Sequence, residues 1–262
     1  MEHTKKNFSI YNQNVVGYVF IMPWLVGFLC FTLVPFLMSF VLSFTNFNIL
    51  SSDTKFIGLD NYVKLFTQDK LFIKSLKVTF KFAFISVPLR LIFALFVAMI
   101  LNRKSRAVPI YRVVYYLPSI IGGSVAVSVM WRNLFTKAGV INSLLQAVGI
   151  DCRLNWLSNT KTALFTLILL YVWQFGSSML IFLSGLKQIP VSYYEAAEVD
   201  GAGKVRQFFS ITLPLLSPII LFNLVMQIIN GFMVFTQAQI ITNGGPVNET
   251  LVYILYLYQN SF

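Results

Sequence analysis

The feature that most constrains this chain is a series of long stretches without charge. A bilayer core about 30 Å thick is crossed by roughly 20 helical residues, and five stretches meet or exceed that length. Within one of them, 82–102, Arg90 is the one charged residue. The pattern predicts an all-α integral membrane protein with spans at about 16–46, 79–102, 113–132, 162–185 and 216–241.

Composition supports lipid as the solvent for much of this surface. The chain is 57% apolar and only 11% charged, whereas soluble proteins carry about 25% charged residues. The net charge of +11 is spread between the apolar runs, as membrane-flanking anchors are. Nucleic-acid binding would need a basic face, so we expect membrane lipid as a partner and no nucleic acid. The one histidine, His3, and the separated Cys30 and Cys152 predict no metal site and no catalytic site.

The regions outside the spans have their own patterns. We expect residues 1–14 to form a polar tail and 15–262 the transmembrane domain. No cleavage pattern follows the first apolar run, so it is interpreted as a retained helix. The segment 53–81 alternates Lys with apolar residues, which predicts an interfacial amphipathic helix, and a short helix outside the membrane is expected at 140–148. The apolar stretch after Leu251 is too short to cross a membrane, so a sixth span is expected to be missing from this sequence.

Basic residues give only a weak indication of orientation. With the N-terminus inside, nine Lys and Arg would lie on the inner side and ten on the outer side. The short segment 102–112 carries four basic residues and no acid, and short loops obey the positive-inside rule best. This favours a cytoplasmic N-terminus.

The loop at 187–214, after the fourth span, contains the most informative pattern. Ser192 with Glu195 three residues later predicts a capping box, and Asp200 to Gly203 predicts a sharp turn. Between them, Ala196 and Ala197 make a slim helix that suits insertion into a groove of another protein. An ordinary connector with a cap and a turn is the alternative.

This loop resembles the EAA signature loop of the membrane permeases of binding-protein-dependent ABC importers. The matching residues are Glu-Ala-Ala-x-x-Asp-Gly-Ala at 195–202, followed by Ile-x-Leu-Pro at 211–214 and Pro218. Other motifs are similar to the carbohydrate branch, which includes maltose and glycerol-phosphate importers; these motifs lie at 18–23, 56–62, 116–118 and 242–246. The resemblance implies a type I ABC importer permease fold with six transmembrane helices, the last one missing or incomplete here.

The resemblance also implies a mechanism and a set of partners. The loop would be a coupling helix that docks on a cytoplasmic ATPase subunit, and its coupling residues would be Glu195, Ala196, Ala197, Asp200, Gly201 and Ala202. The partners would be a second homologous permease, a dimer of ATPase subunits that use ATP and Mg, and an extracellular solute-binding protein. The chain has no phosphate-binding Gly-x-x-x-x-Gly-Lys-Ser/Thr loop, so we expect a transport subunit and not an enzyme, with no cofactor of its own. The location would be the bacterial plasma membrane, with several crossings and a cytoplasmic N-terminus.

Polar side chains inside the spans are candidates for the solute pathway. Asn223, Gln227 and Asn230 are spaced to share one helix face, and Gln237 is expected to extend that stripe. Gln174 in the fourth span is a further candidate. Amides suit sugar hydroxyls, but they also join helices to each other, and both roles stay open. For Arg90, a structural role satisfied by carbonyls or by a partner subunit is favoured over a carboxylate or phosphate contact.

We therefore expect the permease subunit of an ATP-driven importer of a sugar or oligosaccharide. An importer of a polyol or glycerol phosphate is the alternative within the family. An ion-coupled secondary transporter would want acidic residues inside the membrane, whereas all nine Asp and Glu lie outside the predicted spans. A membrane-embedded enzyme would want a His cluster or paired carboxylates, which are also missing from the spans.

Overall fold

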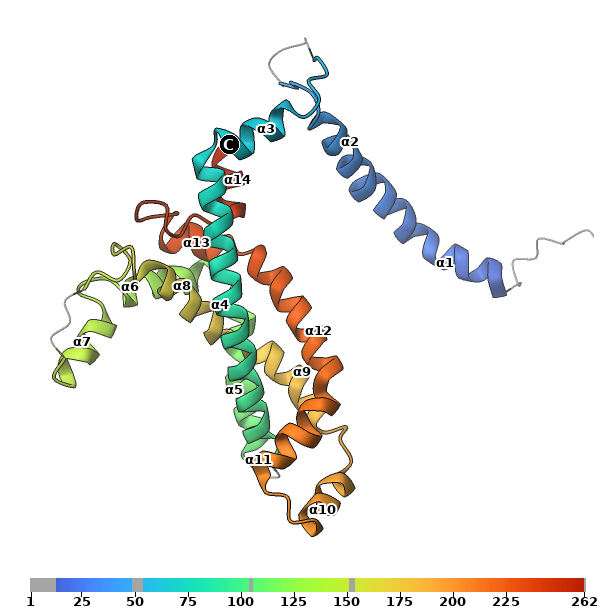
Figure 1. Cartoon of the computed structure of the whole chain (residues 1–262), viewed down its shortest axis with the longest axis vertical. Coiled ribbons are helices and arrows are strands. Elements are labelled where there is room, and N and C mark those ends of the chain that lie inside the picture. Colours follow the sequence, from blue (N-terminus) through green and yellow to red (C-terminus); the bar gives the residue numbers. More distant parts are fainter. Residues whose placement is uncertain (1–12, 49–53, 104–105, 151–153, 262) are drawn as a thin grey trace, which may run out of the picture. The chain divides into compact units, whose positions relative to one another are not determined.

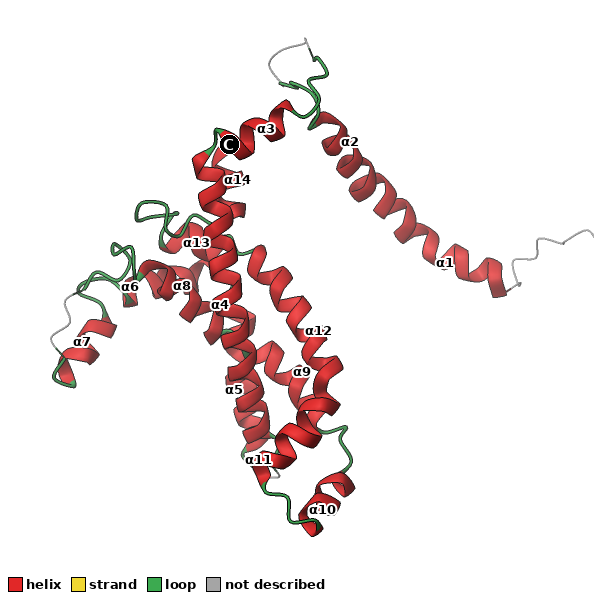
Figure 2. Cartoon of the chain, in the orientation of Figure 1, coloured by secondary structure: helices red, strands yellow, loops and turns green. Residues whose placement is uncertain are grey.

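The computed structural model describes residues 13–48, 54–103, 106–150 and 154–261. Most of the predicted N-terminal tail, together with His3 and Cys152, lies outside these residues. The described chain forms two compact units, one ending at Asp69 and the other beginning at Lys70. Figure 2 shows helices joined by loops in both units, and an isolated β-bridge joins Thr45 to Phe56.

The first unit is built on one long apolar helix. Helix α1 (Gln13–Phe28) continues through a wider π-helical turn (Leu29–Leu33) into α2 (Val34–Leu42). No residue of the most apolar 18-residue stretch of this helix is buried, so its apolar side chains need lipid or another protein as solvent. The short helix α3 (Asp60–Thr67) follows. The amphipathic helix predicted over 53–81 is therefore divided: α3 covers only its middle, and residues from Lys70 onward belong to the next long helix.

The second unit is organised around α4 (Lys70–Leu101). Figure 1 shows this helix running the length of the unit, and helices from later in the sequence pack on it. Its inner face repeats at helical spacing, with Phe82, Val87, Ala94 and Ala98 all buried. The helices packed on α4 are α8 (Ala163–Trp173), α9 (Gly176–Leu186), α12 (Leu213–Phe232) and α14 (Tyr253–Ser261).

Helix α5, which packs on α9, and several short helices complete this unit. They are α5 (Val108–Ile121), α6 (Val125–Leu134), α7 (Val140–Ala147), α10 (Val191–Val199), α11 (Lys204–Gln207) and α13 (Thr236–Ile241), with a π-helical turn (Phe208–Thr212) between α11 and α12. Helix α7 lies where a short helix is predicted at 140–148. Figure 1 shows α10 and α11 at one end of the unit and α13 and α14 at the other.

Two of the predicted spans are bent. The span expected as one helix over 113–132 is instead α5 and α6, which meet at 98° around Gly122 and Gly123. The paired glycines weaken the helix there, and Ser124 starts the new helix by accepting a hydrogen bond from the Val127 N–H. Helices α8 and α9, over the predicted span 162–185, meet at 42°.

Two other predicted boundaries differ from the helices. Helix α4 begins at Lys70, well before the predicted start of the span at 79. The lysines on its first turns are compatible with a helix, but they interrupt the uncharged stretch on which the prediction depends. The predicted span 216–241 covers most of α12 and all of α13, which are separated by Met233 to Phe235. By length and composition, three described helices can cross a membrane, or up to five if each bent pair is one span. The membrane boundaries themselves stay predictions.

Glycines allow the closest helix contacts in the second unit. A Cβ on Gly176 would meet the carbonyl oxygen of Tyr115 and the Cα of Tyr116, so α9 touches the α5 backbone there. A Cβ on Gly185 would meet side chains of Leu216 and Ile219 on α12. Small residues at such crossings are typical of helices packed in membranes, because they let backbones approach each other.

Candidate functional site

The loop that carries the EAA-like pattern folds as a helix, a turn and a second helix. Pro190 precedes α10, and the helix ends at Asp200. Gly201 then adopts φ +75°, a left-handed conformation that favours glycine. The Ala202 N–H donates to the Ala197 carbonyl at 2.8 Å, and the Gly201 N–H donates to the Glu198 carbonyl at 3.0 Å. The predicted turn is confirmed, and it closes the helix by a C-terminal cap.

The predicted capping box is wrong. Helix α10 begins at Val191, directly after Pro190, and no side chain caps its first turn. Ser192 is therefore already inside the helix, where its hydroxyl is past the N-cap position. Pro190 sets the start of α10 instead. Its ring fixes φ, and its extended ψ of 133° lies outside the helical range, so the helix begins at the next residue.

The six predicted coupling residues all lie on this loop. Glu195 and Ala196 are exposed on α10, Ala197 is half-buried, and Asp200, Gly201 and Ala202 form the turn. The Glu195 carboxylate makes no hydrogen bond or ion pair with the described part of the chain. Nearby apolar side chains are also exposed, with Val199 at 88% and Val205 at 73%. An unpaired carboxylate beside exposed apolar groups is suited to contact with another protein.

Internal contacts hold the loop in place. The Glu198 carboxylate pairs with the Lys204 ammonium across the turn, and the Gln207 side chain donates to the Ala202 carbonyl at 3.0 Å. The hydrogen bond and the charge of Lys204 lower the pKa of Glu198 below its ordinary value. At the base of α10, the hydroxyls of Tyr194 and Thr212 are 2.8 Å apart. Since Thr212 leads directly into α12, this contact joins α10 to a long helix of the unit.

The predicted pathway residues separate into different environments. Asn223 and Gln227 are buried on the inner face of α12, whereas Asn230 is exposed on the same helix. Gln237 does not extend this stripe, because α12 ends at Phe232 and Gln237 lies on α13. No Pro and no charged residue lies between Asn223 and Gln237. A stripe predicted from spacing alone therefore runs past the end of α12.

Two of these amides join helices. The Tyr171 hydroxyl on α8 lies within hydrogen-bond distance of the Gln227 side-chain oxygen, at 3.3 Å, and of its backbone carbonyl, at 2.8 Å. The Gln174 side chain donates to the Gly122 carbonyl at 3.2 Å. Asn223 is different, because its side chain is fully buried and neither its oxygen nor its nitrogen has a hydrogen-bond partner in the described structure. A buried amide without partners is costly, so Asn223 is the strongest pathway candidate of the set.

The environment of Arg90 extends this polar region. Its guanidinium donates to the Gln174 carbonyl and to the Ser177 hydroxyl, and it lies 4.5 Å from the centroid of the Tyr171 ring. The Arg90 Nε is buried and has no partner in the described structure, so a carbonyl satisfies this guanidinium only in part. Sequence reasoning missed Ser86 and Ser178, whose buried hydroxyls have no described partner. Lone serines in apolar runs carry no signal by themselves. We call Ser86, Ser178 and Asn223 the unpaired polar set.

Comparisons with known proteins agree with this architecture. Residues 90–262 match the family described as "Binding-protein-dependent transport system inner membrane component". The chain is 58% identical over 260 residues to the "Probable ABC transporter permease protein YesP" of Bacillus subtilis, covering 98% of this chain and 84% of the relative. It is 32% identical to the arabinooligosaccharides transport system permease protein AraP of the same organism, covering 95% of this chain and 79% of the relative.

A solved structure has the same fold. A chain from the crystal structure of a bacterial alginate ABC transporter, in complex with an alginate pentasaccharide-bound periplasmic protein, has a TM-score of 0.75 and 24% identity, covering 93% of this chain and 82% of that chain. Such permeases are transport components and not enzymes, and they are multi-pass proteins of the bacterial cell membrane. The chain belongs to the family of binding-protein-dependent transport system inner membrane components, the permease subunits of ABC importers.

Proposed function

We propose that this subunit translocates a sugar or oligosaccharide into the cell. The support is the resemblance of its motifs to the carbohydrate branch and the 32% identity to a permease named for arabinooligosaccharides. Amide and hydroxyl groups inside the helix bundle add to this, because they both donate to and accept from sugar hydroxyls. Among the buried amides that the structure describes, Asn223 has neither its side-chain oxygen nor its nitrogen in a hydrogen bond.

The observation that carries the proposed coupling is the α10 loop. Helix α10 presents an unpaired carboxylate at Glu195 and exposed apolar side chains, and Tyr194 and Gly201 hold it in a defined shape. We propose that α10 docks on one subunit of a cytoplasmic ATPase dimer that uses ATP and Mg. A second homologous permease would complete the pathway, and an extracellular solute-binding protein would deliver the sugar. Docking of α10 in the cytoplasm would also place the N-terminus there.

The first experiment measures ATP hydrolysis by the reconstituted complex of both permeases and the ATPase dimer. It adds the loaded solute-binding protein and a panel of sugars, polyols and glycerol phosphate. We expect stimulation by one carbohydrate and its loss in Glu195→Ala, because the lone carboxylate has no role inside the chain. If Glu195→Ala weakens binding of the permease to the ATPase dimer tenfold, the binding free energy falls by about 1.4 kcal/mol. Stimulation by glycerol phosphate alone would contradict the sugar assignment.

A matched control separates docking from folding. Asp60→Asn removes an exposed carboxylate of the other unit, whose ion pair with Lys64 is 3.6 Å long, and surface pairs of this kind contribute little stability. This variant should keep wild-type stimulation. If Glu195→Ala assembles with the ATPase as tightly as Asp60→Asn and is stimulated equally, α10 is not the docking element.

A further inference from the structure

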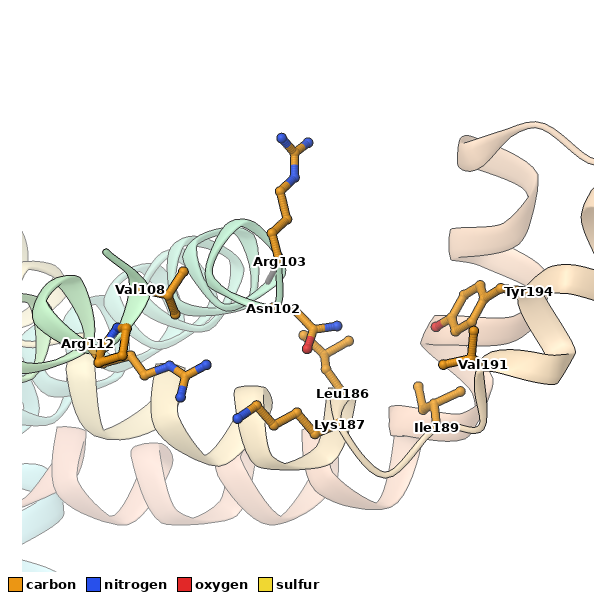
Figure 3. A pocket seen from close by; sticks show the side chains of 10 residues that line it. Asn102, Arg103, Val108, Arg112, Leu186, Lys187, Ile189, Val191 and Tyr194 are labelled. Carbon is orange, nitrogen blue, oxygen red and sulfur yellow. The ribbon is translucent and has the colours of Figure 1, made fainter. Parts of the chain in front are cut away.

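A basic pocket lies beside the coupling loop, separate from the polar residues inside the bundle. Its volume is about 490 Å³, within the range of ligand sites. Figure 3 shows it between the ends of α4 and α9, the start of α5 and the first turns of α10. We call it the basic pocket, and its lining residues are Asn102, Arg103, Val108, Pro109, Arg112, Leu186, Lys187, Ile189, Val191 and Tyr194.

The pocket has positive charge without a counter-charge. Arg103, Arg112 and Lys187 line it, and none of its lining residues is acidic. No described carboxylate pairs with any of the three. In Figure 3 the charged ends of Arg112 and Lys187 point into the same space, whereas Arg103 points away from them. Cations that converge in this way repel each other, so an anion between Arg112 and Lys187 would be strongly favoured.

The hydrogen-bond donors of Arg112 are also largely unused. One guanidinium nitrogen donates to the Leu101 carbonyl at 3.4 Å, which is a long bond. Its Nε is buried and has no partner in the described structure. An Arg fork together with a Lys ammonium offers several charge-assisted donors to tetrahedral oxygens. The chemistry that uses both is a phosphate group.

We propose that the basic pocket binds a phosphate group, supplied by an anionic phospholipid headgroup or by free phosphate. Exposed apolar side chains on the same helices favour the lipid as the source. Ile110 and Val113 on α5 are 67% and 68% exposed, and they provide a surface for acyl chains next to the charges. Basic pockets between membrane helices on the cytoplasmic side are suited to acidic headgroups. The opposite wall of the pocket is Val191 and Tyr194 of α10, so the occupant lies against the coupling helix.

Native mass spectrometry of the assembled, delipidated transporter complex tests this binding. The probes are phosphatidylglycerol, and phosphatidylcholine as the zwitterionic comparison. We expect selective binding of phosphatidylglycerol, weakened at least about tenfold in Arg112→Gln and in Lys187→Gln. The matched control is Arg106→Gln, an exposed cation between α4 and α5 that does not line the pocket. If Arg112→Gln does not assemble, Lys187→Gln, at an exposed side chain, still decides the result.

A second titration separates the two sources. Inorganic phosphate at millimolar concentration should leave bound phosphatidylglycerol in place if the lipid is the natural occupant. Binding of inorganic phosphate by the wild type but not by Lys187→Gln, without selective lipid binding, would support the phosphate site and assign free phosphate as its ligand. Equal binding of both lipids and no phosphate binding, or a loss in Arg106→Gln as large as in the pocket variants, would overturn the proposal. These readouts do not depend on transport, so they remain informative if the sugar assignment fails.

Discussion

Glu195 and Glu198 lie nearly one turn apart on α10 and have opposite surroundings. Glu195 has no described partner, whereas Glu198 pairs with Lys204. That pairing lowers the pKa of Glu198, so its stabilising effect on the turn is present above the ordinary Glu range. The effect is lost as the pH falls through the lowered pKa.

The titration of Glu198 gives a direct test of this pairing. Lys204→Met should raise the pKa of Glu198 toward the ordinary Glu value, because it removes both the hydrogen bond and the charge. Carbon NMR of the complex with labelled Glu side chains measures the shift. An unchanged Glu198 titration in Lys204→Met would show that the ion pair does not form.

Gly201 is the residue on which the shape of the coupling loop depends most. An L-residue in the left-handed conformation costs about 1–2 kcal/mol, so Gly201→Ala should strain the turn and reduce solute-stimulated ATP hydrolysis several-fold. Gly203→Ala is the control, because Gly203 has an ordinary φ of −67° and nothing lies within 4 Å of an added Cβ. Equal activity of the two variants would mean that the turn is not rigid during coupling.

A substitution of Asn223 distinguishes a role in the solute pathway from a role in helix packing. Replacing an unpaired buried amide by an apolar group of similar shape is neutral or stabilising, so Asn223→Leu should keep or raise the thermal stability of the complex. If the amide contacts the solute, the same variant should lower transport strongly. Melting temperature and uptake are measured on one preparation. Lower stability with unchanged uptake would assign Asn223 to packing alone.

Residue-level prediction succeeded where one side chain determines the local structure. The turn at Gly201 and the carbonyl-bound Arg90 could be predicted, because only a few conformations or partners satisfy those residues. Ser192 was assigned as a cap although Pro190 already begins the helix. Spacing alone puts Gln237 on the stripe of Asn223, whereas the helix ends at Phe232, directly after Gly231. Both errors give too little weight to a neighbouring residue, Pro190 in the first case and Gly231 in the second.

At the scale of elements, charge-free runs located the long helices but not their bends or ends. Lysine is a good helix former, so Lys70 to Lys81 belong to α4 although they interrupt the charge-free run. The 98° bend between α5 and α6 follows from Gly122 and Gly123, which the span pattern passed over. Hydropathy reports the solvent of a segment, whereas bends depend on backbone freedom and on neighbouring helices.

The contact between α5 and α9 should be intolerant of any side chain. Gly176→Val would place atoms against the backbone of Tyr115 and Tyr116, which cannot move as a side chain does. Overpacking of this kind costs about 1–3 kcal/mol, so we expect a clearly lower melting temperature. Gly27→Val, where nothing lies within 4 Å of the added Cβ, is the control. Equal melting temperatures would show that the two helices separate easily.

At the scale of the whole molecule, this chain has the fold and the family of an importer permease, but part of its apolar surface is uncovered. No residue in the most apolar stretch of Val16–Leu42 is buried. In the second unit, α10 exposes apolar side chains, among them Val191 and Val199. Both features are expected of one subunit in a larger membrane complex. The family and the helices could be inferred from the sequence, whereas the basic pocket required the structure, since Lys187 is far from Arg103 and Arg112 in the chain.

The most direct test of the proposed function is uptake of labelled oligosaccharide into proteoliposomes that contain the complete complex. ATP is enclosed or omitted, with and without a proton or sodium gradient. We predict uptake that requires ATP and the solute-binding protein, is unaffected by collapse of the ion gradients, and is lost in Glu195→Ala. Uptake that persists without ATP and follows an ion gradient would contradict an ATP-driven importer and indicate a secondary transporter.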